Sequence, residues 1–176
     1  MRVGNTDRQY QNSTFLSVEK DIALIVQKIM EDNELKKLLY YSTKDCLTQP
    51  DLNQEQTYSL INKQIKIIPK LPIESAEFPC IAISFDNYTP NATNPQFRDC
   101  VVSFDIFCPY SLWEIGDFRQ RVYKIAGRID ARLNNQKFTG IGTLQFMGSN
   151  YINVNKDTGA VVLMYSAVHG TDDKIE

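Results

Sequence analysis

The chain has 176 residues, of which 43% are hydrophobic and 23% charged, as is ordinary for a globular protein with its own apolar core. A formal charge of −2 gives no overall attraction to nucleic acid or acidic membranes. No apolar run approaches the roughly 20 residues that span a bilayer, and the N-terminus lacks the apolar run of a secretory signal. We therefore expect no membrane contact and a protein that stays in the compartment where it is made, or in a particle assembled there.

The N-terminal third is predicted to be helical after a polar arm. Residues 1–14 are polar and aperiodic, so we expect a flexible arm, followed by one domain over 15–170 and a frayed tail over 171–176. Ser17 is the expected N-cap of a first helix whose apolar stripe runs to Ile29. Asn33 is the expected cap of a second helix over "NELKKLLYYS".

Two strands are predicted in the middle of the chain. Before them, three prolines confine any strand in "IKIIPKLPIESAEFP" to a sheet edge. Residues 80–88 and 98–108 alternate as strands do, and the turn-rich "TPNATNPQ" between them predicts a long hairpin connection. In the second strand one face is wholly apolar: Cys100, Val102, Phe104, Ile106 and Cys108.

A long amphipathic helix is predicted after Pro109, which ends the preceding strand. Ser111 and Glu114 have the spacing of a capping box, so the helix is expected to begin near Leu112 and to continue for about five turns. Its apolar stripe is Ile115, Phe118, Val122, Ile125, Ala126, Ile129 and Leu133.

The C-terminal third predicts two more strands. "NKDTG" reads as their hairpin turn, with Gly159 at positive φ, and Gly140, Gly142 and Gly148 suggest a bent or bulged strand. The predicted class is α+β: a single twisted, mainly antiparallel sheet of about four strands with helices packed on one face.

No catalytic motif is present in the sequence. The four cysteines form no CxxC pair, and Cys80, Cys100 and Cys108 lie in apolar strand-like runs, where a thiol acts as a small hydrophobe. No phosphate-binding glycine loop or GxSxG elbow occurs. We therefore expect no catalytic residue, metal or cofactor, and not an enzyme. The remaining nucleophile–base pair is Cys108 with His169, which leaves a small cysteine hydrolase as an alternative.

A basic stripe follows the outer side of the long helix: Arg121, Lys124, Arg128 and Arg132. One interpretation is a solvated face with i,i+4 pairs such as Asp117–Arg121. The other is a surface for an acidic partner or DNA. Four charges are few beside the ~6–10 phosphates that strong DNA binders neutralise, so a monomeric DNA-binding module is an alternative that a steep salt dependence would reveal.

Aromatic residues gather at predicted element ends: Phe107, Tyr110, Trp113, Tyr40 and Tyr41. Such side chains serve at interfaces as often as they fill cores. Together with the missing catalytic set, they favour a subunit of an assembly.

The element order resembles the tail terminator or tail completion proteins of tailed bacteriophages. The resemblance covers residues 16–170 and is carried by "LKKLLYYS", "IIPKLP", "PCIAISFDNY" and above all "FDIFCPYSLWEIGDFRQRVYKIAGRIDARL". It implies a virion protein, assembled in the bacterial cytoplasm, that forms a hexameric ring at the head-proximal end of the tail tube. Its implied partners are other copies of itself, the tail tube protein, the head–tail connector, and DNA that passes through the lumen without sequence recognition.

The resemblance also implies roles for several residues. The basic stripe would face a neighbouring subunit or the channel, with Asp105, Glu114 and Asp117 as its acidic complement, and charge reversal at Arg128 would weaken the ring. Another neck or head-completion connector protein is the alternative within the same class.

Overall fold

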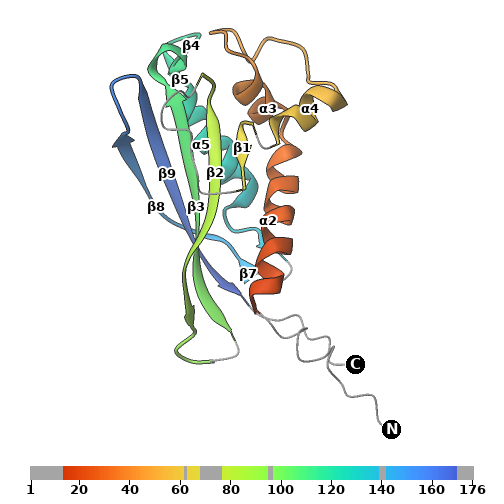
Figure 1. The fold of residues 1–176 in the computed structure, drawn as a ribbon, viewed down its shortest axis with the longest axis vertical. Helices are drawn as coiled ribbons and strands as arrows, with labels where there is room; N and C mark the ends of the chain where they lie inside the picture. The colour runs from red at the N-terminus through yellow and green to blue at the C-terminus, as the bar shows by residue number, and fades with distance from the viewer. Residues whose placement is uncertain (1–13, 62, 68–76, 95–96, 139–141, 170–176) are drawn as a thin grey trace.

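A five-stranded sheet forms the centre of the fold, with the helices gathered on one of its faces (Figure 1). The computed structural model describes residues 14–61, 63–67, 77–94, 97–138 and 142–169. The predicted arm over 1–14, apart from Thr14, and the predicted tail over 171–176 lie outside these ranges.

The sheet has the strand order β1-β2-β3-β9-β8. Its long strands are β2 (Cys80–Pro90), β3 (Arg98–Pro109), β8 (Gln145–Asn153) and β9 (Thr158–His169), and all their pairings are antiparallel. β1 (Ile65–Lys66) pairs with β2 in parallel. The two predicted hairpins, β2–β3 and β8–β9, are therefore confirmed.

In the described part of the chain four α-helices accompany the sheet: α2 (Thr14–Met30), α3 (Asn33–Tyr40), α4 (Gln54–Leu60) and α5 (Arg121–Leu133). α5 lies against β3 and β9, and α2 and α3 pack on α5. None of the helices in the described ranges combines the length and apolar character that crossing a bilayer requires.

The core lies between the sheet and α5. The apolar face of β3 is buried as predicted, and its register sets Phe104 opposite Leu163 and Val102 opposite Tyr165. Ile125 and Ile129 of α5 and Ile25 and Ile29 of α2 are fully buried in the same cluster. The two-residue periodicity thus identified the core face of β3 correctly, and the 3.6-residue periodicity did so for the apolar stripe from Val122 to Leu133.

The predicted sheet of about four strands is wrong, although the α+β class holds. The central sheet has five strands and is mixed, and two small two-stranded sheets accompany it: β4 (Glu114–Ile115) with β5 (Arg119–Gln120), and β6 (Lys137–Phe138) with β7 (Gly142–Thr143). β1 lies at a sheet edge, where the prolines of residues 65–79 were expected to confine any strand, but it was not counted among the four because it is only two residues long. It forms where the chain returns from α4, and the Ile81 amide donates to the Gln64 carbonyl at 2.7 Å.

The starts of two helices also differ from the prediction, and a third helix was not predicted. α2 already includes Thr14, so Ser17 is not its cap. The cap of α3 is Asp32, whose carboxylate accepts from the Leu35 amide at 2.9 Å, and Asn33 is the first helical residue. α4 was not predicted, although Asn53 and Gln56 form a capping box at its start.

Candidate interaction surface at the aromatic end of the sheet

The segment between β3 and α5 forms a structured loop at one end of the sheet. After Pro109 the chain makes a 3₁₀ turn, η1 (Tyr110–Leu112), and then the β4–β5 hairpin. The predicted helix start near Leu112 is therefore wrong, because α5 begins at Arg121. Asp117 and Phe118 have φ values of 64° and 59°, which a right-handed helix does not allow, and the hairpin bend uses both.

Arg121 fixes this loop from inside the molecule. Its side chain is fully buried, and its guanidinium donates to four backbone carbonyls at 2.7 to 2.8 Å. The acceptors are the carbonyls of Leu112, Leu38, Tyr41 and Thr43. One side chain therefore ties the loop to the end of α3, and it satisfies carbonyl groups that would otherwise be buried without partners.

The rest of the basic stripe is directed at α3 of the same chain. Asp32 is fully buried, and its carboxylate accepts from Arg128 Nε at 2.9 Å and Arg132 Nε at 3.0 Å. Lys124 and Arg128 also lie 3.3 and 3.4 Å from Glu34. The stripe is therefore largely neutralised within the chain.

These contacts hold the Asp32 carboxylate in its charged form. Burial alone would raise the pKa of Asp32, but the hydrogen bonds from Arg128, the Leu35 amide and Arg132 outweigh it and leave the pKa below its ordinary value. Charge reversal at Arg128 is consequently an unsuitable test of ring assembly, because it would first disturb this buried carboxylate.

Of the three candidate acidic residues, Glu114 and Asp117 lie in the β4–β5 hairpin and Asp105 lies in β3. Asp117 pairs with Arg119 and not with Arg121 as predicted, and Glu114 accepts from Lys44 at 2.9 Å. Asp105 lies on the sheet face away from the helices, between Ala82 and Val162 in the register. Burial and the nearby Asp86 carboxylate raise the pKa of Asp105. Their role in an interface stays a prediction.

Two of the five predicted aromatic residues, Tyr110 and Trp113, form a cluster with Tyr151, which the sequence analysis did not single out, and this cluster is the aromatic end of the sheet. Tyr40 and Tyr41 contact each other, with ring centroids 5.1 Å apart. The Tyr110 and Trp113 rings lie 5.4 Å apart, and the Trp113 and Tyr151 rings 6.1 Å apart. The Tyr110 and Tyr151 hydroxyls share a hydrogen bond of 2.7 Å. Phe107 is half-buried on the outer sheet face, opposite Cys80 and Ala160. Tyr151 could not be assigned earlier because β8 brings it here only through the β8–β9 pairing.

Gly159 allows the cluster to approach the sheet. A Cβ atom at this position would lie 2.9 Å from the Trp113 ring and 3.0 Å from the Tyr110 ring. Among the described glycines only Gly142 has positive φ, so the predicted positive φ of Gly159 is wrong. Its small size is what the structure requires.

Phe118 is the most exposed large apolar side chain of the described residues. It is 96% exposed at the tip of the β4–β5 hairpin, although the helical pattern had assigned it to the core. A bulky residue at positive φ is uncommon and carries a conformational cost of roughly 1–2 kcal/mol. An apolar ring held in this way is suited to insert into a partner surface.

The alternative pair Cys108 and His169 is not brought together. In the β3–β9 register Cys108 is opposite Gly159 and His169 is opposite Arg98, so roughly 30 Å of strand separates them. Burial raises the pKa of Cys108 to about 12, which keeps this thiol protonated at neutral pH. All four cysteines are buried, as the sequence predicted for the three in strands.

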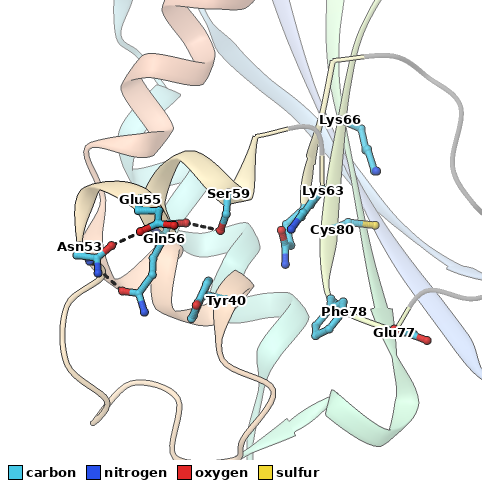
Figure 2. Close-up of a pocket in the computed structure, with 11 residues that line it drawn as sticks. Tyr40, Asn53, Glu55, Gln56, Ser59, Lys63, Lys66, Glu77, Phe78 and Cys80 are labelled. Atoms are coloured by element: carbon cyan, nitrogen blue, oxygen red, sulfur yellow. Dashed lines mark hydrogen bonds between the residues drawn. The ribbon is translucent and has the colours of Figure 1, made fainter.

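A recess of about 1080 Å³ lies between α4 and the start of β2 (Figure 2). Tyr40, Ser59, Lys63, Phe78 and Cys80 line it together with the capping pair of α4. Burial raises the pKa of Cys80 to about 11, so its thiol is not a nucleophile at neutral pH. Within the described ranges no three His, Cys, Asp or Glu residues are grouped so that they could hold a metal ion.

Comparison with known proteins gives a family match and two similar proteins. The YomW family profile matches residues 32–167. The "SPbeta prophage-derived uncharacterized protein YomW" of Bacillus subtilis (strain 168) is 27% identical over 130 residues, which are 67% of this chain and 76% of that protein. A chain from the virion of a native gene transfer agent particle is 16% identical and covers 64% of this chain and 83% of its own length, with a TM-score of 0.38. A TM-score this low does not establish a shared fold.

Proposed function

The chain belongs to the YomW family, and on this premise we propose that it is a structural protein of a phage particle, a tail terminator. It forms a ring at the head-proximal end of the tail tube, stops addition of tube subunits and joins the tail to the head connector. DNA passes through the ring without sequence recognition. The prophage origin of the Bacillus subtilis relative supports a phage protein, and the resemblance in element order supports the terminator role.

The observation that carries the proposal is the construction of the aromatic end. Four hydrogen bonds from the buried Arg121 side chain hold a loop whose outward features are an aromatic cluster and the exposed ring of Phe118. Rigid aromatic anchors of this kind typically dominate the binding energy of an interface. A protein built in this way acts by shape and association, and we propose that it makes or breaks no covalent bond.

The side chains of the basic stripe stabilise the subunit itself more than they offer positive charge to DNA. Lys124, Arg128 and Arg132 already face carboxylates of α3, so few free charges remain for phosphate. DNA that passes through the proposed ring would therefore meet little attraction from this stripe. This suits a channel, because strong binding would hold the DNA in place.

Deletion of the gene from an inducible prophage tests the proposal. Because an uncapped polymer keeps growing, we expect electron micrographs to show over-long tails that are not joined to heads, and a plasmid copy of the gene should restore normal particles. Tails of normal length that accumulate beside unjoined heads would indicate a connector instead. Normal, complete particles without the gene would contradict both roles.

A further inference from the structure

β8 is an open edge of the central sheet from Gly148 onward. It is the last strand in the order β1-β2-β3-β9-β8, and no other described strand pairs with its outer side (Figure 1). At its start the Phe146 amide already donates to Asn134 Oδ1 at 3.2 Å. The backbone groups on the outer side of an edge strand can pair with another strand. Eight of its nine residues are exposed, so its side chains are also available to a partner.

β8 lacks the features that usually protect an edge. Its sequence, "QFMGSNYIN", contains no charged residue and no proline. Its one irregularity lies between Phe146 and Gly148 and leaves Ser149–Asn153 as an uninterrupted stretch. This is long enough for a stable ladder of backbone hydrogen bonds.

The opposite edge of the sheet is protected in several ways. β1 covers the first residues of β2. Further along, β2 has an irregularity between Asp86 and Thr89, Asn87 at a φ of 52°, and Pro90 at its end. Each of these features discourages pairing with a further strand. The contrast between the two edges makes β8 the pairing edge.

The composition of β8 fits a second copy of itself. From Gln145 to Gly148 the strand has an amide side chain, two apolar side chains and a small residue. From Asn153 back to Asn150 it has an amide side chain, two apolar side chains and a polar residue, and Ser149 lies in the middle. Antiparallel pairing of two β8 strands therefore sets apolar side chains near apolar ones and opposes no like charges. The four exposed apolar side chains concerned are Phe146, Met147, Tyr151 and Ile152.

We propose that β8 is a self-association site at which two copies of this chain pair antiparallel and form a continuous ten-stranded sheet. The contact is isologous, since the same strand serves on both sides of a twofold axis. It cannot close a ring, which requires a heterologous contact, so it is separate from the ring contact of the proposed function. The site joins the aromatic end through Tyr151.

The mass of the purified full chain measures this contact. We expect light scattering to give twice the 20.2 kDa of one chain at micromolar concentration. Asn150→Lys places two lysines diagonally across the twofold axis and should raise the dimer dissociation constant at least about tenfold, because the two like charges repel each other across the strand pair. Ala92→Lys adds the same charge at an exposed site on the distant β2–β3 hairpin and should leave the dimer intact.

A monomeric wild-type chain at high concentration would overturn the proposal. An Asn150→Lys variant that unfolds at the wild-type urea concentration and remains dimeric would also overturn it. Conversely, a monomeric Asn150→Lys variant that still completes phage particles would support the β8 contact and leave the proposed function standing. Failure of the gene-deletion test would leave the β8 dimer unaffected.

Disulfide trapping identifies the strands that meet. The four native cysteines are buried, so a cysteine introduced at Ser149, Asn150 or Tyr151 is the reactive thiol. Residues near the axis of an antiparallel pair approach closely enough for a disulfide. Under mild oxidation, at least one of the three variants should form a covalent dimer, whereas Ala92→Cys, on the distant β2–β3 hairpin, should not. Equal cross-linking at Ala92, or none at the three β8 positions, would show that two β8 strands do not meet.

Discussion

At the residue scale, Arg121 is unusual because its guanidinium is fully buried. Within the described residues, the hydrogen bonds of this guanidinium all go to backbone carbonyl groups, and it forms no ion pair. The arginine fork can serve four acceptors at once, which a lysine ammonium cannot do. The residue predicted to lie on an outer stripe is therefore the centre of the loop that carries the aromatic end.

Replacing Arg121 by alanine should lower the free energy of unfolding by about 4 kcal/mol or more. Each buried carbonyl left without a donor costs roughly 1–3 kcal/mol, and partial hydration reduces the sum. Urea denaturation measures the change. Arg121→Lys should be intermediate, and Arg119→Ala, which loses only an exposed pair with Asp117, should stay within about 0.5 kcal/mol of wild type. A tolerated Arg121→Ala variant would mean that the carbonyls find other donors.

Asp32 should make stability depend on acid pH. Its pKa in the folded protein lies below the ordinary value of about 3.9, so its contribution is fully present above that pH and is lost as pH falls through the folded-state pKa. Asp32→Asn should cost about 2–3 kcal/mol at pH 7, less than a fully buried pair because Arg128 and Arg132 are partly exposed.

The difference in free energy of unfolding between the Asp32→Asn variant and the wild type should therefore become smaller when the urea titrations are repeated from pH 7 down to pH 3. Asp117→Asn provides a matched control, since Asp117 is exposed and pairs only at the surface. A cost of Asp32→Asn that stays constant over this range would contradict the assigned charge pairing.

At the element scale, the segment 110–133 shows how a convincing helical pattern was partly overridden. Ser111 and Glu114 have the right spacing for a capping box, yet the chain forms a hairpin there and begins α5 at Arg121. The tertiary contacts of Arg121 and the close packing of Trp113 on Gly159 stabilise the alternative. Local propensity is worth only tenths of a kcal/mol per residue, so such contacts decide the outcome.

Two glycines should respond in opposite ways to alanine. Gly159→Ala introduces a Cβ atom that meets the Trp113 and Tyr110 rings, so we expect a loss of about 1–3 kcal/mol and a changed fluorescence of Trp113, the single tryptophan. Gly127 is exposed in α5, with no atom within 4 Å of an added Cβ, so Gly127→Ala should stabilise by about 0.5–1 kcal/mol. Equal effects would show that the cluster does not pack on Gly159.

At the scale of the whole molecule, five of the exposed large apolar side chains lie on two elements that could meet a neighbouring subunit. Phe118 lies at a hairpin tip, and Phe146, Met147, Tyr151 and Ile152 lie on the free sheet edge. The buried side of the sheet is closed by helices of the same chain (Figure 1). This distribution suits a subunit that has a stable core of its own and offers separate contacts to its neighbours.

Phe118→Asn should separate stability from assembly. Asparagine tolerates positive φ, so the free energy of unfolding should stay unchanged or rise by up to about 1 kcal/mol. If Phe118 is an anchor, its loss removes about 2 kcal/mol or more of binding energy, and complementation of the deleted prophage should yield fewer complete particles. Tyr58→Gln removes another exposed aromatic residue, on α4, and should complement normally. Normal particle yield with Phe118→Asn would remove Phe118 from the interface.

The sequence by itself determined the α+β class, the two long hairpins and the buried face of β3, because hydrophobic periodicity reflects burial directly. The capping box that marks the start of α4 is also present in the sequence. Only the tertiary structure decided the two-residue strand β1, the α5 boundary, the exposure of Phe118 and the partners of the basic stripe. Asp32 and Arg128 are 96 positions apart, and no periodicity within a helix reveals a partner on another helix. Such features depend on long-range contacts, whose energies exceed local preferences and are fixed only when the elements pack.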